Sequence, residues 1–140
     1  MIFVDTSFFF AVASAKDPDH DRCTEVLESF GNRRLHDLLV TTNHVVFETI
    51  RLTRRQIGHA AAVVMGKALY QEQMARVHWA TAEEEKEAFA YLTKYQDKDY
   101  SMVDCLSFVV MDRLKILEAL TIDEDFTHRY VARPGPASPR

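Results

Sequence analysis

The sequence predicts an α/β fold, an α/β/α sandwich with a mainly parallel central sheet. Short apolar runs of strand length alternate along the chain with longer segments whose apolar residues have helical spacing. Such alternation is typical of parallel sheets whose helical crossovers cover both faces. The chain has 140 residues and no internal repeat or linker, so we expect one domain with a real core. We assign residues 1–132 to this domain and the proline-rich end, 133–140, to a flexible tail.

The expected strands are short and apolar. They cover residues 2–5, 38–41, 76–79 and 119–122. The expected helices are delimited by capping residues: Asn43 caps the third, Thr81 forms a capping box with Glu84, and Gly58 ends a helix. The helices cover residues 7–14, 19–30, 43–57 and 59–75, a segment after Thr81, and a segment from Ser101 to Leu114.

Composition indicates an ordinary soluble globular protein, with 47% hydrophobic and 27% charged residues. The net charge of -4 argues against broad nucleic-acid binding through a basic surface, but an acidic nuclease site would itself add negative charge. Cys23 and Cys105 form no CxxC motif and fit reduced thiols. The apolar run 8–13 is too short to span a membrane and follows no basic segment, so we expect a cytoplasmic protein.

Four carboxylates stand in apolar settings: Asp5, Glu48, Asp104 and Asp123. Asp5 and Asp123 each end a strand, whereas Glu48 and Asp104 lie near the start of apolar helices. Strand ends and following helix starts share one edge of a parallel sheet, so all four acids are expected to converge there. Close carboxylates repel one another unless they are protonated or bind metal, and all-oxygen sites favour Mg²⁺ or Mn²⁺ over Zn²⁺.

Each acid also has a purely structural alternative. Asp5 and Asp123 can serve as helix caps. Glu48 can form a surface ion pair with Arg51, and Asp104 can interact with the N-terminal dipole of its helix. Asp125, two positions after Asp123, is the rival for the fourth acidic position.

The ordered set of motifs resembles PIN-domain ribonucleases and, within them, VapC toxins of toxin–antitoxin pairs. The matching pieces are Val4-Asp5-Thr6-Ser7, Val45-Val46-Phe47-Glu48, Lys94-Tyr95-Gln96-Asp97 leading to Ser101 and Asp104, and Leu120-Thr121-Ile122-Asp123 with Phe126. The resemblance implies a PIN-like fold and assigns catalytic and metal-binding roles to Asp5, Glu48, Asp104 and Asp123, with Ser7 and Ser101 as accessory residues. Many relatives have alanine where this chain has Cys105, a small side chain in either case.

The resemblance further implies a Mg²⁺- or Mn²⁺-dependent endoribonuclease that cuts single-stranded or looped RNA, of the tRNA or rRNA class. It implies a homodimer that is blocked by a VapB-like antitoxin. A metal-bound hydroxide would attack phosphorus, and no histidine or lysine is placed as a nucleophile. The basic residues Arg51, Arg54 and Arg55 are candidates for phosphate contacts, although cations near a helix C-terminus also complement its dipole.

Three other classes of protein share parts of this pattern. A phosphatase of the haloacid dehalogenase type needs a second aspartate two positions after Asp5, where this chain has Ser7. A receiver domain needs an adjacent acidic pair before the first helix and a late lysine at a strand end, and both are missing. The remaining alternative is a catalytically silent PIN-like module that binds RNA or protein, and the presence of all four acids argues against it.

Overall fold

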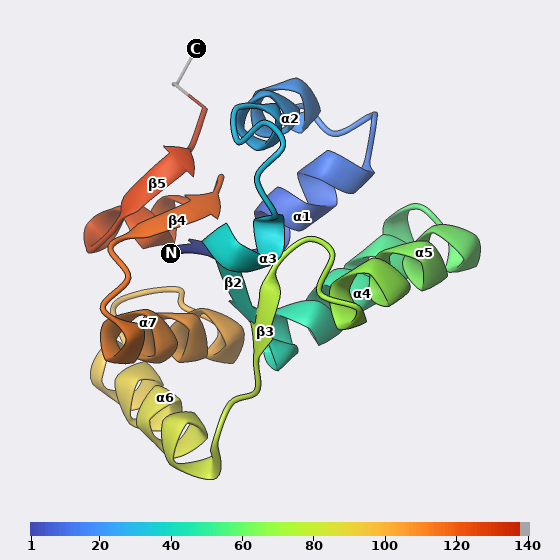
Figure 1. Ribbon diagram of the computed structural model, residues 1–140. Coiled ribbons are helices and arrows are strands. Elements are labelled where there is room, and N and C mark those ends of the chain that lie inside the picture. The colour runs from blue at the N-terminus through green and yellow to red at the C-terminus, as the bar shows by residue number, and fades with distance from the viewer. Residues whose placement is uncertain (138–140) are drawn as a thin grey trace.

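The computed structural model describes residues 1–137 and shows a five-stranded, all-parallel sheet within them. The strands lie in the order β3-β2-β1-β4-β5 (Figure 1). Their bounds are β1 Ile2–Val4, β2 Leu39–Thr42, β3 Arg76–His78, β4 Glu118–Thr121 and β5 Val131–Pro134. The predicted α/β/α sandwich with a parallel sheet is therefore confirmed.

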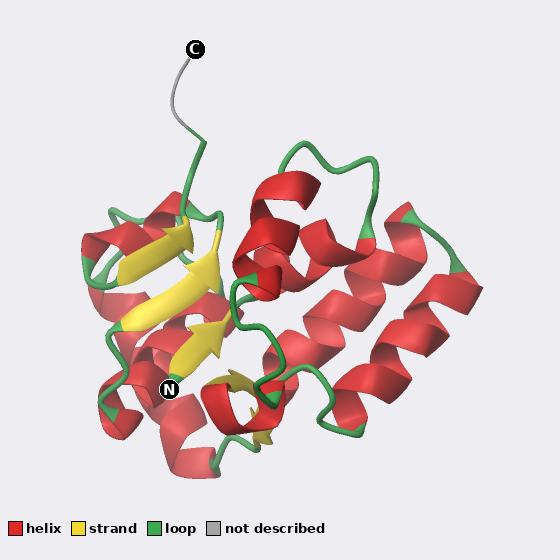
Figure 2. Ribbon diagram, turned by 45° about the horizontal axis from the view of Figure 1, so that its top comes forward, coloured by secondary structure: helices red, strands yellow, loops and turns green. Residues whose placement is uncertain are grey.

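Helices cover both faces of the sheet, as Figures 1 and 2 show. Helices α6 and α7 lie on one side, and α1, α2, α4 and α5 lie on the other. Their bounds are α1 Thr6–Ala13, α2 His20–Glu28, α3 Leu35–Leu38, α4 Asn43–Gln56, α5 His59–Tyr70, α6 Ala82–Lys94 and α7 Met102–Leu114, with a 3₁₀ helix, η1, at Glu124–His128. No helix in the described part of the chain is long and apolar enough to cross a membrane.

The core lies where the central strands meet the flanking helices. Phe3 and Val4 of β1 are fully buried, because a central parallel strand is covered on both faces. Phe108 of α7 and Phe126 of η1 pack edge to face with ring centroids 5.0 Å apart. Cys23 is also buried, as a free thiol, as the sequence predicted.

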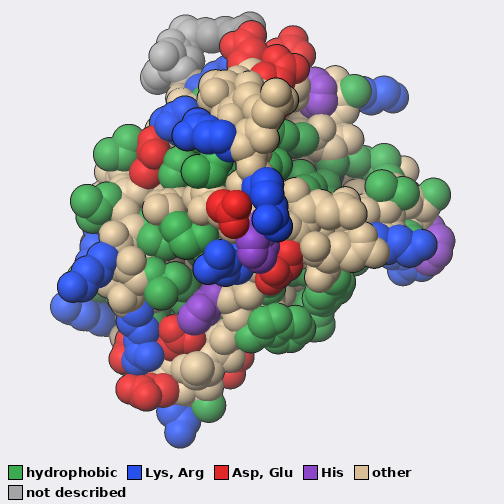
Figure 3. Space-filling view, in the orientation of Figure 1, with side chains coloured by type: hydrophobic (Ala, Val, Ile, Leu, Met, Phe, Trp, Pro, Cys, Tyr) green, Lys and Arg blue, Asp and Glu red, His purple; other side chains and the backbone are tan. Residues whose placement is uncertain are grey.

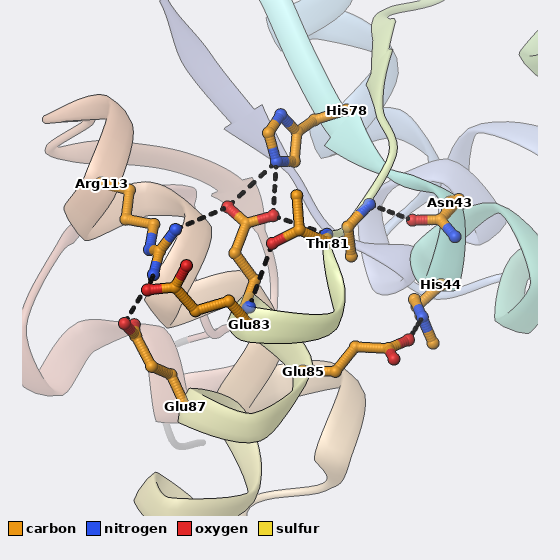
Figure 4. A network of polar contacts seen from close by, with 10 residues as sticks. Asn43, His44, His78, Thr81, Glu83, Glu85, Glu87 and Arg113 are labelled. Carbon is orange, nitrogen blue, oxygen red and sulfur yellow. Dashed lines mark hydrogen bonds and ion pairs between the residues drawn. The ribbon is translucent and has the colours of Figure 1, made fainter.

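Two predicted caps are confirmed and one is wrong. Thr81 and Glu84 form the capping box of α6, and Ser101 caps α7. Helix α4 is capped by Thr42 instead of Asn43, because the Thr42 hydroxyl accepts from Val45 N–H. Asn43 instead accepts from the Ala80 N–H at 2.9 Å and ties α4 to the end of β3 (Figure 4).

A second polar network joins β3, α6 and α7 (Figure 4). Glu84 is only 3% exposed. Its carboxylate accepts hydrogen bonds from the Thr81 N–H at 2.9 Å and from His78 Nε2 at 3.0 and 3.1 Å. Burial opposes ionisation of Glu84, but these hydrogen bonds outweigh it and lower its pKa. Arg113 of α7 reaches the carboxylates of Glu83 and Glu87 on the same helix as Glu84.

Strand β5 was not predicted, and it takes in residues assigned to the tail. Arg133 and Pro134 pair with β4, and Gly135 is buried, with its N–H bonded to the Thr121 carbonyl. The Arg22 guanidinium of α2 donates to the carbonyls of Pro134 and Gly135. The segment lacks an apolar run because it is an edge strand, where proline is tolerated. Residues 138–140 of the predicted tail lie outside the described residues.

Candidate active site

The strand order reverses between β1 and β4, which pair directly with each other. The chain proceeds from β1 through β2 to β3 on one side, and then returns to build β4 and β5 on the other. In open parallel sheets, ligands bind outside the carboxyl ends of the strands at such a reversal. Asp5 directly follows β1 and Asp123 lies two residues beyond the last residue of β4, so both acids stand at this point.

Asp5 is buried, with 4% of its surface exposed, and its carboxylate is not used to cap a helix. Burial raises the pKa of Asp5 to about 6, and the charge of Asp123 adds to the rise. The Ser7 hydroxyl opposes it by donating to Asp5 Oδ2 at 2.9 Å. The capping alternative for Asp5 is thus not what the structure shows.

Two hydroxyls hold Asp5 in place and connect it to the end of β4. Both Ser7 Oγ and Thr121 Oγ1 donate to Asp5 Oδ2, at 2.9 and 3.1 Å. Each hydroxyl also accepts a backbone N–H, Ser7 from Ile122 and Thr121 from Asp123. Each hydroxyl thus donates to Asp5 Oδ2 and is itself fixed by a backbone N–H, so the orientation of the Asp5 carboxylate is well defined.

Asp104, Asp123 and Asp125 form the tightest acidic group. One carboxylate oxygen of each lies within 4.8 Å of the others, and all three side chains are half-buried. Burial raises the pKa of Asp104 to about 7, and the charges of Asp5 and Asp123 add to it. Asp5 therefore interacts electrostatically with these acids, and the four carboxylates of Asp5, Asp104, Asp123 and Asp125 form one acidic centre.

Two of these acids also serve their helices, as the structural alternatives proposed. Asp104 is the third residue of α7 and accepts from the Ser101 N–H, completing a capping box. Asp123 accepts from the Asp125 N–H and caps η1. Each carboxylate has a second oxygen, so capping and membership of the acidic group coexist. The structure keeps both Asp123 and Asp125 beside Asp104, where the sequence treated them as rivals.

Glu48 is half-buried on the second turn of α4, and it lies outside the group of three acids found among residues 1–137. The predicted alternative, an ion pair with Arg51, is absent from the described part of the chain. The next residue, Thr49, is buried, and its hydroxyl lies 3.5 Å from that of Thr6. Helix α4 thus packs beside the chain that directly follows Asp5.

In the described part of the chain, the acidic centre has little compensating charge, and it comes from His128, which opposes the rise in the pKa of Asp125. Within residues 1–137, no lysine or arginine forms an ion pair with Asp5, Asp104, Asp123 or Asp125. The pKa of Asp125 is raised as well, mainly by burial and secondly by the charge of Asp123. A divalent cation would relieve this repulsion, and a set of carboxylate oxygens suits Mg²⁺ or Mn²⁺.

A family model described as the PIN domain matches residues 2–132. The chain belongs to the PIN-domain family. The 23S rRNA-specific endonuclease VapC20 of Mycobacterium tuberculosis is 37% identical over 127 residues, which are 91% of this chain and 92% of that protein. Ribonuclease VapC26 of the same organism is 30% identical over 122 residues, 87% of this chain and 86% of that protein.

The solved structures agree with this assignment to the PIN domain. The crystal structure of Mycobacterium tuberculosis VapC20, described as a sarcin-ricin loop cleaving toxin, superposes with a TM-score of 0.82 at 35% identity. The match covers 91% of this chain and 94% of that one. The predicted resemblance to VapC-type PIN-domain ribonucleases is confirmed, and with it the predicted endoribonuclease activity.

One contributor to the centre was given no role by the sequence analysis. Thr121 lies inside a motif that was used only for its order along the chain. Its hydroxyl bonds both Asp5 and the backbone of Asp123. The sequence did contain a signal for this role: Thr121 is a hydroxyl residue at the end of a buried strand, two positions before Asp123. Ser7 likewise stands two positions from an acid, Asp5.

Proposed function

We propose that this VapC-type endoribonuclease hydrolyses RNA with Mg²⁺ or Mn²⁺ held at the acidic centre. Asp104, Asp123 and Asp125 would hold the ion, with Asp5 beside them and Glu48 of α4 as a further candidate. The observation that carries the proposal is the approach of three carboxylates within 4.8 Å, with no lysine or arginine among the described residues paired with them. An arrangement of this kind stabilises a fold poorly, but it suits a divalent cation.

When bound, the ion lowers the pKa of a water molecule and neutralises charge on the phosphate. The protein supplies position and a proton acceptor. Ser7 and Thr121 fix Asp5 through Oδ2, so the Asp5 carboxylate keeps one orientation. The Asp5 carboxylate, held in this way beside the ion, would accept the proton from water.

We propose ribosomal RNA as the substrate class. Its support is the 37% identity to an endonuclease named as 23S rRNA-specific, over 91% of this chain. The phosphate backbone of the substrate must approach the carboxylates closely. An exposed loop of ribosomal RNA can reach an acidic centre at the edge of the sheet in this way.

We further propose a homodimer and neutralisation by a VapB-like antitoxin, as the family resemblance implies. Large apolar side chains on the surface support at least one protein interface: Phe47 is 67% exposed and Trp79 is 61% exposed. Size-exclusion chromatography with light scattering tests the dimer, and a monomer at all concentrations would exclude it.

Cleavage of purified ribosomes and of total RNA, with and without Mg²⁺ or Mn²⁺, tests the activity. Asp104→Asn and Asp5→Asn should each abolish cleavage while the protein stays folded. Asp21→Asn, an exposed carboxylate on α2, is the matched control and should cut like the parent protein. Full activity in Asp104→Asn would refute the acidic centre as the active site. Glu48→Gln decides separately whether Glu48 takes part.

A further inference from the structure

A basic hollow lies at the outer end of the α4–α5 hairpin. It is lined by Arg51, Arg54, Arg55 and His59, and it has a volume of about 510 Å³. Only Ile57 and Gly58 connect the two helices, so the start of α5 returns directly to the last turns of α4. Figure 3 shows blue and purple side chains at that end of the hairpin and no red ones beside them.

The three arginines are not neutralised by the protein. In residues 1–137, none of them forms an ion pair or donates a side-chain hydrogen bond to the protein. Among residues 1–137, every other arginine except Arg76 has at least one such partner, as Arg22 and Arg113 illustrate. The chain as a whole carries a net charge of -4, so this cluster stands against the overall charge.

The spacing of the arginines is unfavourable for the helix alone. Arg54 and Arg55 stand three and four positions after Arg51, where like charges face and repel each other. Favourable interaction with the helix dipole extends only over the last turn, which includes Arg54 and Arg55 but not Arg51. Arg54 also lines an adjacent apolar hollow together with Ile50 and Val63.

Helix α4 also connects this hollow to the acidic centre. Arg51 and Arg55 follow Glu48 by three and seven residues, so they lie on nearly the same face of the helix. At 1.5 Å per residue, they stand about 4.5 and about 10 Å farther along its axis. A nucleic-acid strand that places one phosphate at the carboxylates can therefore place neighbouring phosphates along this stripe.

We propose that Arg51, Arg54, Arg55 and His59 form a binding site for the phosphate backbone of RNA. Guanidinium groups bind phosphate oxygens with two hydrogen bonds each, and the hollow offers no carboxylate to compete. The site holds a stretch of backbone that adjoins the cut phosphodiester and sets its register on the enzyme. This inference rests on the proposed ribonuclease function and adds a substrate-binding site to it.

The test compares two triple variants of the full chain that remove the same charge. The first is Arg51→Gln, Arg54→Gln and Arg55→Gln. The control removes three exposed cations elsewhere: Arg34→Gln, Arg76→Gln and Lys86→Gln. Affinity for a fluorescently labelled RNA hairpin is measured by anisotropy in EDTA, over a series of salt concentrations. Thermal unfolding of both variants checks that they are folded. If the first triple variant does not fold, the single variant Arg51→Gln is measured in its place.

The first variant should bind RNA more weakly, by a factor on the order of ten or more. Each lost phosphate contact lowers the magnitude of the slope of log affinity against log salt by about 0.7, so three lost contacts should lower it by about 2. The control should keep affinity and slope close to those of the parent. Equal losses in both variants, or no loss in the first, would overturn the inference. Cleavage by the parent protein with Mg²⁺ is scored separately, so a failure of the ribonuclease proposal is distinguished from a failure of the arginine site.

Discussion

Replacing Asp5 with asparagine should stabilise the metal-free protein at alkaline pH, although it should also abolish cleavage. Burial and neighbouring charge raise the pKa of Asp5 from 3.8 to about 6 in the folded protein. One pKa unit corresponds to about 1.4 kcal/mol, so ionised Asp5 costs the fold about 3 kcal/mol. Asp5 is 4% exposed, so solvent screens little of this energy.

The sign follows from proton binding. Below pH 3.8 the carboxyl is protonated in both the folded and the unfolded chain, and folding loses nothing through it. As the pH rises through the folded value of about 6, the folded protein must give up a proton that it holds more tightly than the unfolded chain does. Stability contributed by Asp5 is therefore lost across this window. Between pH 4.5 and pH 8 the loss should be about 2 kcal/mol.

Asparagine removes this dependence and keeps the shape of the side chain. Its amide oxygen can accept the hydrogen bonds that Ser7 and Thr121 donate to Oδ2. The amide nitrogen then replaces Oδ1, and the loss of an acceptor there lowers stability by a similar amount at every pH. The informative quantity is thus the change, between the two pH values, in the stability difference between Asp5→Asn and the parent.

Urea unfolding in EDTA at pH 4.5 and pH 8 measures that change. Asp5→Asn should gain about 2 kcal/mol on the parent when the pH is raised from 4.5 to 8. Asp21→Asn, at an exposed position, should show no such gain. An equal stability difference at the two pH values would refute the assignment of Asp5 as a buried, destabilised carboxyl. Saturating Mg²⁺ should then stabilise the parent more than Asp5→Asn.

Three further predictions concern the polar networks and the metal. Thr121→Val should cost about 1–3 kcal/mol in urea unfolding, because it leaves the Asp123 N–H without its acceptor, and an unchanged midpoint would contradict this. Glu84→Gln should lower stability by about 1–3 kcal/mol, because it weakens charge-assisted bonds from His78 and the Thr81 N–H, while RNA cleavage stays intact. EDTA should abolish cleavage and added Mn²⁺ or Mg²⁺ should restore it; activity that persists after exhaustive chelation would exclude a metal-dependent mechanism.

The sequence was informative about central strands and about helix starts with side-chain caps. The runs before Asp5 and Asp123 are apolar because both strands are covered on both faces, and this made them easy to recognise. Ser101 and Thr81 are followed three positions later by an acid, which is a local signal that needs no tertiary structure. Strand β5 gave no such signal, because an edge strand needs no continuous apolar run.

The acidic centre was predicted in outline, and its details depend on tertiary structure. Strand topology indicates that Asp5, Asp104 and Asp123 reach one edge of the sheet. That Asp125 joins Asp104 and Asp123 depends on the tight turn of η1, and local spacing alone does not reveal it. Likewise, Glu48 was predicted to converge with the other acids, but it lies outside the group of three found among the described residues, and its distance from that group depends on how α4 packs.

The pairing of β1 with β4 also affects how this ribonuclease is made in the cell. Asp5 and Thr121 share a hydrogen bond across 116 positions of sequence, so this contact can form only after one of the last segments has been synthesised. Such distant contacts form late and slowly in folding. A nascent or truncated chain that lacks β4 has Asp5 but neither Asp123 nor Asp125. An incomplete chain is therefore expected to lack the acidic centre and to cut no RNA.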